Sequence, residues 1–186
     1  MTATTTDRQD VRLGIGRVAL LVAVVSGGVL ADLGTKQWAL EALADEPVPV
    51  LGPFHLTLSF NTGVAFSLGQ SVPAAALALL GALIAVAVAV ASARGTLPTV
   101  PAGLIVGGAV SNVLDRTLDG RVTDFLDVGR WPTFNFADCL IVVGAALLLV
   151  TNTRSESEPK AAGAPQQAPL PSHGPGPDPG SRGTSG

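Results

Sequence analysis

Aspartates are concentrated in one stretch of this chain, where their side chains could perform acid–base chemistry. The stretch runs from residue 107 to residue 138 and contains Asp115, Asp119, Asp124, Asp127 and Asp138. Two carboxyls held together where little water reaches share one proton, because both cannot easily be ionised. The ionised member can take a proton from water while the protonated member polarises a carbonyl group. Such a pair would act as a hydrolase that needs no metal and no cofactor.

Other nucleophiles in the sequence lack a base that could activate them. Ser67, Ser111, Cys139 and Lys36 are candidates, but a serine or cysteine mechanism needs a positioned base. Neither of the two histidines lies in a polar cluster, so the remaining alternative is Lys36 acting on Ser67. The single cysteine and two histidines are also too few for a zinc site. We therefore expect no metal and no other cofactor.

The composition indicates a membrane protein. Hydrophobic residues make up 47% of the chain and charged residues only 13%, whereas a soluble domain carries about 25% charged residues. The mean hydropathy is +0.47. The net charge of −3 and the lack of a basic run argue against a nucleic-acid partner. The length of 186 residues leaves room for one domain.

Four apolar segments predict an all-α membrane protein with four transmembrane helices. The first and fourth apolar cores, 18–31 and 139–150, span about 21 Å and about 18 Å, less than the roughly 30 Å of hydrocarbon. Each helix must therefore extend, which brings Asp32 and Lys36 into the first helix and Asn135 and Asp138 into the fourth. The expected spans are about 18–39, 72–93, 98–115 and 134–151.

The rest of the chain divides around these spans. Residues 1–17 are expected to form a cytoplasmic N-terminal segment, and residues 18–153 the four-helix membrane domain. Residues 41–70 contain partly alternating, proline-interrupted sequence, which predicts a small β-like surface element in the first extracytoplasmic loop. Residues 154–186 are rich in Pro, Gly and Ser, so we expect a disordered cytoplasmic tail with no part in the chemistry.

An even number of spans brings the polar residues to one face of the membrane. Lys and Arg are more frequent on the side of the termini, so that side is expected to be cytoplasmic. Asp32 and Lys36, four residues apart, share a helix face, and a mutually neutralised pair at a helix end is the simplest interpretation. These arguments make Asp138 one member of the carboxyl pair and leave Asp115 and Asp124 as alternatives for the other.

Four sequence blocks resemble those of the bacterial lipoprotein signal peptidases, the signal peptidase II family. They are DLGTK at 32–36, NTGVAFS at 61–67, NVLDRxxxGxVxDF at 112–125 and FNFAD at 134–138. The resemblance implies an aspartic endopeptidase of the bacterial cytoplasmic (inner) membrane. It would remove signal peptides from diacylglyceryl-modified prolipoproteins by cutting before the lipidated cysteine.

The same resemblance assigns roles to individual residues. It makes Asp124 and Asp138 the catalytic pair. The residues expected to bind substrate or shape the site are Asn61, Asn112, Arg116, Asn135, Asp115, Asp32 and Lys36. Two positions depart from the usual blocks, since Ser111 replaces a glycine and Val64 an alanine, which affects fine packing rather than chemistry.

The implied setting is a multi-pass protein with both termini in the cytoplasm and the active site at the extracytoplasmic face. The expected partners are a lipid-modified prolipoprotein substrate and membrane lipids, with the enzyme working as a monomer. A small channel or transporter is one alternative, but it predicts carboxylates spread through the membrane depth. A scaffold that binds partners through the GxxxG pair Gly103 and Gly107 is the other.

Overall fold

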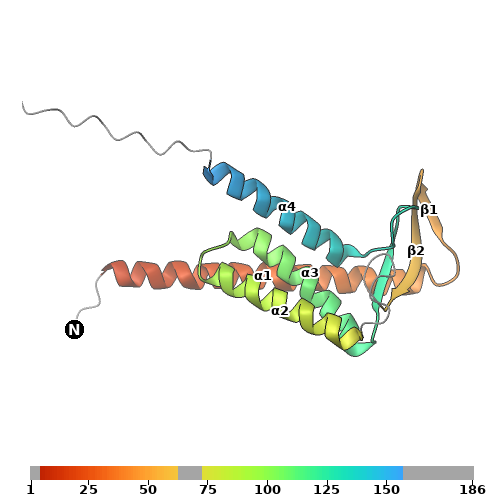
Figure 1. Ribbon diagram of the computed structural model, residues 1–186, viewed down its shortest axis with the longest axis horizontal. Helices are drawn as coiled ribbons and strands as arrows, with labels where there is room; N and C mark the ends of the chain where they lie inside the picture. Colours follow the sequence, from red (N-terminus) through yellow and green to blue (C-terminus); the bar gives the residue numbers. More distant parts are fainter. Residues whose placement is uncertain (1–4, 63–72, 157–186) are drawn as a thin grey trace, which may run out of the picture.

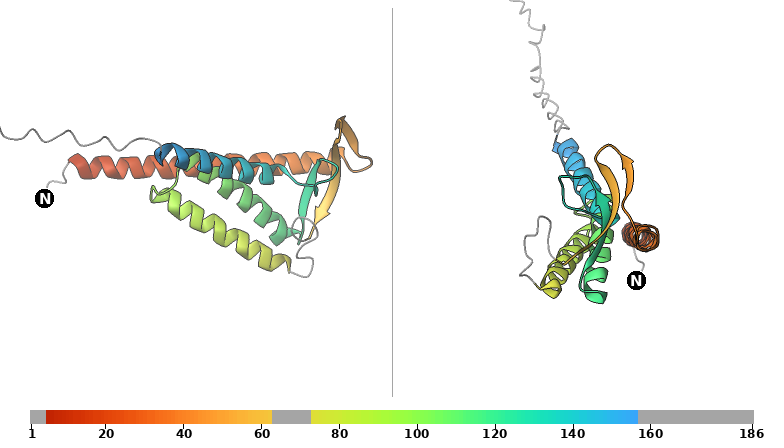
Figure 2. Two further views of the ribbon diagram at one scale, coloured as in Figure 1. Left: turned by 45° about the horizontal axis from the view of Figure 1, so that its top comes forward. Right: turned by 90° about the vertical axis from the view of Figure 1, so that its right-hand side faces the viewer.

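The helices of this protein run side by side, with a small sheet across one end (Figure 1). The computed structural model describes residues 5–62 and 73–156. Within them, α1 (Thr5–Ala42), α2 (Ala74–Ala93), α3 (Thr99–Leu118) and α4 (Phe136–Glu156) are helices. The strands are β1 (Val48–Leu51), β2 (Phe54–Asn61) and β3 (Val122–Asp127). The end-on view in Figure 2 shows the strands crossing the end of the helices.

Two of these helices are long and apolar enough to cross a membrane, judged by length and composition. They are the part of α1 from Arg12 to Ala42 and the whole of α2, while α4 contains a shorter apolar stretch, Phe136–Thr151. Large apolar side chains on α2 such as Leu79, Leu83 and Val86 are exposed. Exposed apolar surface of this extent marks a region that contacts lipid or another apolar partner. The chain is therefore mostly helical with features of a membrane protein.

Glycines let α3 pack closely against α1 and α4. A Cβ atom at Gly103 would lie 2.7 Å from Val24 Cγ1, and one at Gly107 would lie 3.2 Å from the carbonyl oxygen of Val25. At Gly108 an added Cβ would collide with the carbonyl oxygen of Ala137 in α4. The GxxxG spacing of Gly103 and Gly107 thus brings α3 close to α1, as small residues do between packed membrane helices. Because this face contacts α1 of the same chain, a scaffold that offers it to a partner is not supported.

The sheet joins two loops that are distant in sequence, so the β-like element predicted for the first loop gains a third strand that was not expected. The strand order is β1-β2-β3 with antiparallel pairing, and Ser59 lies opposite Asp124 while Asn61 lies opposite Val122. We expected strand-like structure in the first loop but only a charged loop at 122–127. Val122, Asp124 and Phe125 are all buried. A carboxylate at an inward position obscures the apolar alternation that identifies a strand.

Apolar contacts fix the sheet on the C-terminal part of α1. Phe125 belongs to a buried cluster with Ala39 and Leu43, and its ring meets Trp38 edge-on at a centroid distance of 6.3 Å. The chain then returns beside β3 and pairs with it at Leu126. The N–H of Phe134 donates to the carbonyl oxygen of Leu126, and the N–H of Leu126 donates to the carbonyl oxygen of Phe134. This contact brings the start of α4 next to β3.

Several helix boundaries differ from the expected spans. α1 begins at Thr5, inside the N-terminal segment predicted to precede the helix, and α3 continues three residues past the expected end at 115. α4 begins at Phe136, so Asn135 lies just before the helix and not within it. α4 also continues to Glu156, past the expected start of the tail at 154. The tail after 156 and the Val64 and Ser67 positions lie outside the described residues.

Candidate active site

A largely apolar cavity of about 640 Å³ lies beside the sheet, and both candidate aspartates line it. Asp124 comes from β3 and Asp138 from the first turn of α4, so two separate elements contribute the carboxyls. The polar lining residues also include Asn61, Asn112, Arg116 and Thr133. Apolar walls around a few convergent polar groups are typical of a binding site.

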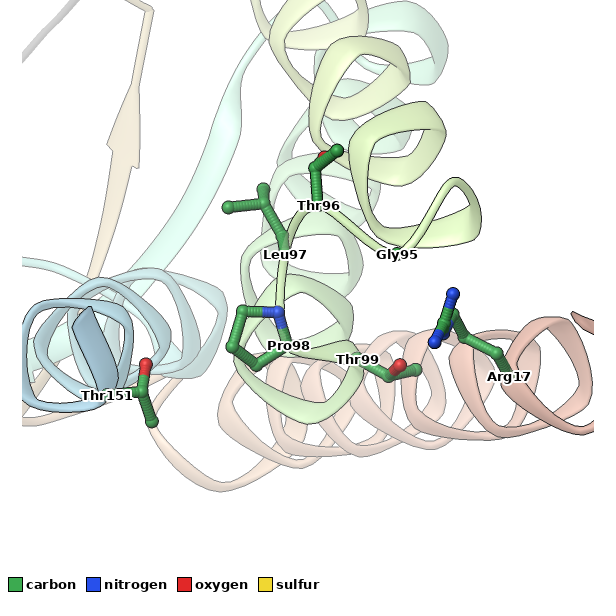
Figure 3. Close-up of a pocket in the computed structure, with 7 residues that line it drawn as sticks. All are labelled: Arg17, Gly95, Thr96, Leu97, Pro98, Thr99 and Thr151. Carbon is green, nitrogen blue, oxygen red and sulfur yellow. The ribbon is translucent and has the colours of Figure 1, made fainter. Parts of the chain in front are cut away.

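A second cavity lies at the opposite end of the helices and has a different character (Figure 3). It measures about 380 Å³ and is lined by Arg17 of α1, the α2–α3 connection and Thr151 of α4. None of its lining residues is a carboxylate. Of these two cavities, only the one at the sheet end is lined by carboxyl groups.

Asp124 is held in an environment that favours its protonated form. Its side chain lies on β3 with only 1% of the residue exposed, and Oδ1 accepts a hydrogen bond from Asn135 Nδ2 at 2.7 Å. Burial and the nearby charge of Asp138 raise the pKa of Asp124 to about 6. Hydrogen bonds from Asn135 and Asn61 and the charge of Lys36 oppose this rise only in part. Asp124 can therefore hold a proton at a mildly acidic pH.

Asp138 is fixed by the hydrogen bonds that begin α4. Asp138 N–H donates to Asn135 Oδ1 at 3.0 Å, and Asn135 N–H donates to Asp138 Oδ2 at 3.3 Å. This reciprocal pair is a capping box made with Asn and Asp. The same carboxylate accepts a hydrogen bond at Oδ1 from Asn112 Nδ2 at 2.9 Å. The N-x-x-D spacing in the sequence is a signal that could have located the start of α4.

Two asparagine amides connect the carboxyls. Asn135 Nδ2 donates to Asp124 and also to Asn112 Oδ1 at 3.1 Å, while Asn112 Nδ2 donates to Asp138. Each amide is therefore oriented by partners at both of its ends. The pair of carboxyls and the pair of amides form one continuous network beside the cavity.

A buried ion cluster lies behind this network. Lys36 Nζ lies 2.6 Å from Asp32 Oδ2 and 2.8 Å from Asp115 Oδ2, and it donates to Asn112 Oδ1 at 3.2 Å. The expected Asp32–Lys36 pair exists, but it lies within α1 and includes Asp115, so the interpretation as a pair at a helix end is wrong. With three acceptors around it, the ammonium group is already engaged, which weakens the alternative in which Lys36 activates a serine.

Asp115 supports β3 and does not line the cavity. Its Oδ2 accepts the backbone N–H of Thr123 at 3.2 Å, directly before Asp124. Because Lys36 and Thr123 both occupy this carboxylate, the geometry favours Asp124 over Asp115 as the partner of Asp138. The exposed Asp119 follows the end of α3, and Asp127 accepts the N–H of Gly129 in a turn.

The remaining expected site residues lie around the cavity. Asn61 ends β2, and Arg116 donates from Nη1 to the carbonyl oxygen of Asn112 at 3.2 Å. Cys139, which directly follows Asp138 in the sequence, also lines the cavity. Among residues 5–62 and 73–156, no group of three or more His, Cys, Asp or Glu side chains could hold a metal ion.

Sequence reasoning did not find the contacts that anchor Asp32. Its Oδ2 accepts a hydrogen bond from Ser111 Oγ and its Oδ1 accepts one from the N–H of Ala137, each at 2.6 Å. Both partners are distant in sequence, so no local spacing could have identified them. Asp32 thereby joins α1, α3 and α4.

Comparison with known proteins places this arrangement in one family. The family model described as signal peptidase (SPase) II matches residues 22–154. A lipoprotein signal peptidase of Caulobacter vibrioides is 40% identical over 153 residues, which is 76% of this chain and 89% of the relative. One from Hydrogenovibrio crunogenus is 42% identical over 135 residues, covering 66% of this chain and 78% of the relative.

A solved structure has a similar fold. It is described as a bacterial membrane enzyme determined by the in meso method at 2.3 Å resolution, and it is 23% identical with a TM-score of 0.65. The match covers 77% of this chain and 93% of that chain. The resemblance found in the four sequence blocks is thus confirmed over most of the chain, and the chain belongs to the signal peptidase II family.

Proposed function

We propose that this protein is an aspartic endopeptidase that removes signal peptides from lipid-modified prolipoproteins, with Asp124 and Asp138 as the catalytic pair. The observation that carries the proposal is that these two carboxyls, from β3 and α4, line one cavity and are linked by two amides. Family membership supports the substrate class, since the curated relatives are named lipoprotein signal peptidases. The cut falls before the lipidated cysteine.

The two carboxyls divide the acid–base work. Asp124, whose pKa is raised to about 6, holds the shared proton and donates a hydrogen bond to the scissile carbonyl oxygen. Asp138 is ionised and takes a proton from the attacking water, whose oxygen bonds to the carbonyl carbon. The tetrahedral intermediate then collapses as Asp138 returns that proton to the leaving amine nitrogen. Asp124 transfers its proton to the carbonyl oxygen as the water adds and takes one back from the gem-diol when the C–N bond breaks, so the pair ends as it began.

The surrounding polar residues hold the substrate and the pair. Asn61 and Arg116 face the cavity and can bind the peptide backbone, and Asn112 and Asn135 orient the carboxyls. Asp32, Lys36 and Asp115 brace these residues from behind. No step of this scheme uses a metal or a cofactor.

The cavity has a wall suited to acyl chains. Val142 and Val143 of α4 line it and are also exposed on the outside of the helix. A lipid-modified peptide could therefore approach sideways from the bilayer, with its acyl chains against α4 and its peptide against the sheet. Trp131, exposed at the same cavity, fits an interfacial position.

The proposed setting is the bacterial cytoplasmic membrane, crossed by all four helices of the domain at 18–153. α3 and α4 run beside the two apolar helices α1 and α2 (Figures 1 and 2), which supports four crossings. The distribution of Lys and Arg supports cytoplasmic termini, a cytoplasmic segment at 1–17 and tail at 154–186, and an extracytoplasmic active site. A monomer contains both carboxyls and suffices for this chemistry.

Cleavage of a defined precursor tests the proposal. The purified protein in detergent, with a metal chelator present, should cut a diacylglyceryl-modified precursor and leave the lipidated cysteine at the new N-terminus, as read by mass spectrometry. The same precursor without the lipid should be cut at least about 10-fold more slowly, because the acyl chains contribute binding energy at the apolar wall. Equal rates for the two precursors would contradict substrate entry from the bilayer.

The raised pKa of Asp124 predicts a pH dependence. The pair loses its shared proton as the pH rises through about 6, so kcat/KM, which reports the free enzyme, should fall over that range. A bound substrate excludes more water, which raises the pKa of Asp124 further, so kcat should fall at a higher pH than kcat/KM does. Initial rates measured from pH 4.5 to 9 test this prediction. If kcat and kcat/KM fell over the same pH range, the prediction would be wrong.

A further inference from the structure

The hydroxyl group of Ser111 makes a contact outside its own helix. Ser111 Oγ donates to Asp32 Oδ2 at 2.6 Å, and both residues are 0% exposed. A serine inside a helix commonly donates to the carbonyl oxygen four residues before it. Here the hydrogen bond joins α3 to α1 across a sequence separation of 79 residues. The hydroxyl therefore contributes to the relative placement of two helices.

Asp32 also contacts the start of α4. Its Oδ1 accepts the backbone N–H of Ala137 at 2.6 Å, and Ala137 directly precedes Asp138. Ser111 holds one oxygen of the Asp32 carboxylate and Ala137 binds the other. The orientation of the carboxylate thus fixes the backbone on which Asp138 is carried.

A second set of contacts connects Ser111 to the carboxyl of Asp138 through Lys36 and Asn112. Asp32 Oδ2, which accepts from Ser111, also holds Lys36 Nζ at 2.6 Å, and Lys36 donates to Asn112 Oδ1 at 3.2 Å. The ammonium group requires an oxygen at that end of the Asn112 amide, because an NH₂ group there would face another donor. The amide nitrogen is consequently left to donate to Asp138 Oδ1 at 2.9 Å.

We propose that Ser111 is a positioning residue for peptide hydrolysis: through Asp32 it fixes both Ala137 and Lys36, and so holds Asp138 in place to act with Asp124. The inference rests on the proposed function, because it requires Asp138 to be catalytic. Ser111 is also one of the two positions at which this chain departs from the usual blocks of its family. A buried serine in α2, Ser92, provides a matched control.

Ser92 is that control. It lies in α2, is also 0% exposed, and its Oγ has no hydrogen-bond partner among the described residues. Ser111→Ala and Ser92→Ala therefore remove the same atom from equally buried helical sites, but only the first change breaks a contact to Asp32. The full-length variants would be purified in detergent and assayed with the lipidated precursor, well below the melting temperature of each.

Ser111→Ala should lower kcat by about 10-fold or more, because a small displacement of a catalytic group is costly. KM should change by less than about 3-fold, since Ser111 does not line the cavity. Ser92→Ala should leave both constants unchanged. Ser111→Cys keeps the volume of the side chain but has only a weak donor, so it should recover little of the kcat lost in Ser111→Ala; full recovery by Ser111→Cys would show that volume, and not the hydrogen bond to Asp32, sets the rate.

The outcomes separate this inference from the proposed function. A kcat of Ser111→Ala equal to that of the parent, with Asp138→Asn inactive, overturns the positioning role and leaves the aspartic mechanism standing. An equal loss in Ser92→Ala and Ser111→Ala also overturns it, because burial alone would then explain both. Substantial turnover by Asp138→Asn overturns the proposed function and with it the reason for positioning Asp138.

Discussion

Replacing either Asp124 or Asp138 by asparagine should reduce cleavage of a lipidated precursor by at least about 10³-fold, while the protein still inserts and folds. Each change removes one partner in proton transfer, which typically contributes about 10²- to 10⁴-fold to the rate. A single remaining carboxyl cannot act as both the acid and the base. Asparagine keeps the size of aspartate and an oxygen that can accept from Asn112 or Asn135. The measurement is single-turnover cleavage by purified variants.

The double variant gives a sharper result than either single change. If the two carboxyls act as one unit, Asp124→Asn with Asp138→Asn should be no slower than the single variants, because the second loss removes nothing further. Asp119→Asn is the matched control, since Asp119 is an exposed aspartate of the same stretch and lies outside the cavity. Its rate should equal that of the parent. Independent, multiplicative losses at Asp124 and Asp138 would exclude a shared proton.

Lys36→Met should strongly lower the stability of this protein. Lys36 is 3% exposed and lies against the carboxylates of Asp32 and Asp115. Removing its charge leaves two buried carboxylates without their counter-ion, and breaking a buried pair in this way costs about 3–5 kcal/mol. The melting temperature, followed by tryptophan fluorescence in detergent, should fall by roughly 10 °C.

Two further variants separate the lost ion cluster from the lost side chain. Arg94→Met removes a cation that is exposed and forms no ion pair within the described residues, so it should not change the melting temperature. Adding Asp115→Asn to Lys36→Met removes one of the stranded charges and should recover part of the loss. A double variant less stable than Lys36→Met would show that repulsion between the stranded carboxylates is not the cause.

The parts of the fold that follow local rules could be predicted from the sequence. The apolar segments located four helices, and the close packing at Gly103 and Gly107 followed from their spacing. β3 was missed because Asp124 occupies a buried position where a strand normally carries an apolar side chain. The start of α4 was placed too early because span length was considered without the capping box at Asn135.

The candidate site could be predicted only where chemistry and sequence blocks coincide. Placing a carboxylate at membrane depth is energetically unfavourable, and this made Asp138 a candidate functional residue. The resemblance to the family blocks then selected Asp124. The geometry adds a reason of its own, since Asp115 is occupied by Lys36 and Thr123. The hydrogen bonds from Ser111 and Ala137 to Asp32 join residues far apart in sequence, and no periodicity in a single chain records such a contact.

The hydrogen bond from Ala137 to Asp32 has a consequence for the timing of activity. It connects α1 with α4, the first and last helices among the described residues, across 105 residues. Asp124 leaves the ribosome before Asp138, and the hydrogen bonds from Asn112 to Asp138 and from Asn135 to Asp124 cannot form until α4 docks against α3 and β3. Under the proposed mechanism, a partly inserted chain therefore lacks a complete catalytic pair, and hydrolytic activity arises only when α1 to α4 have assembled.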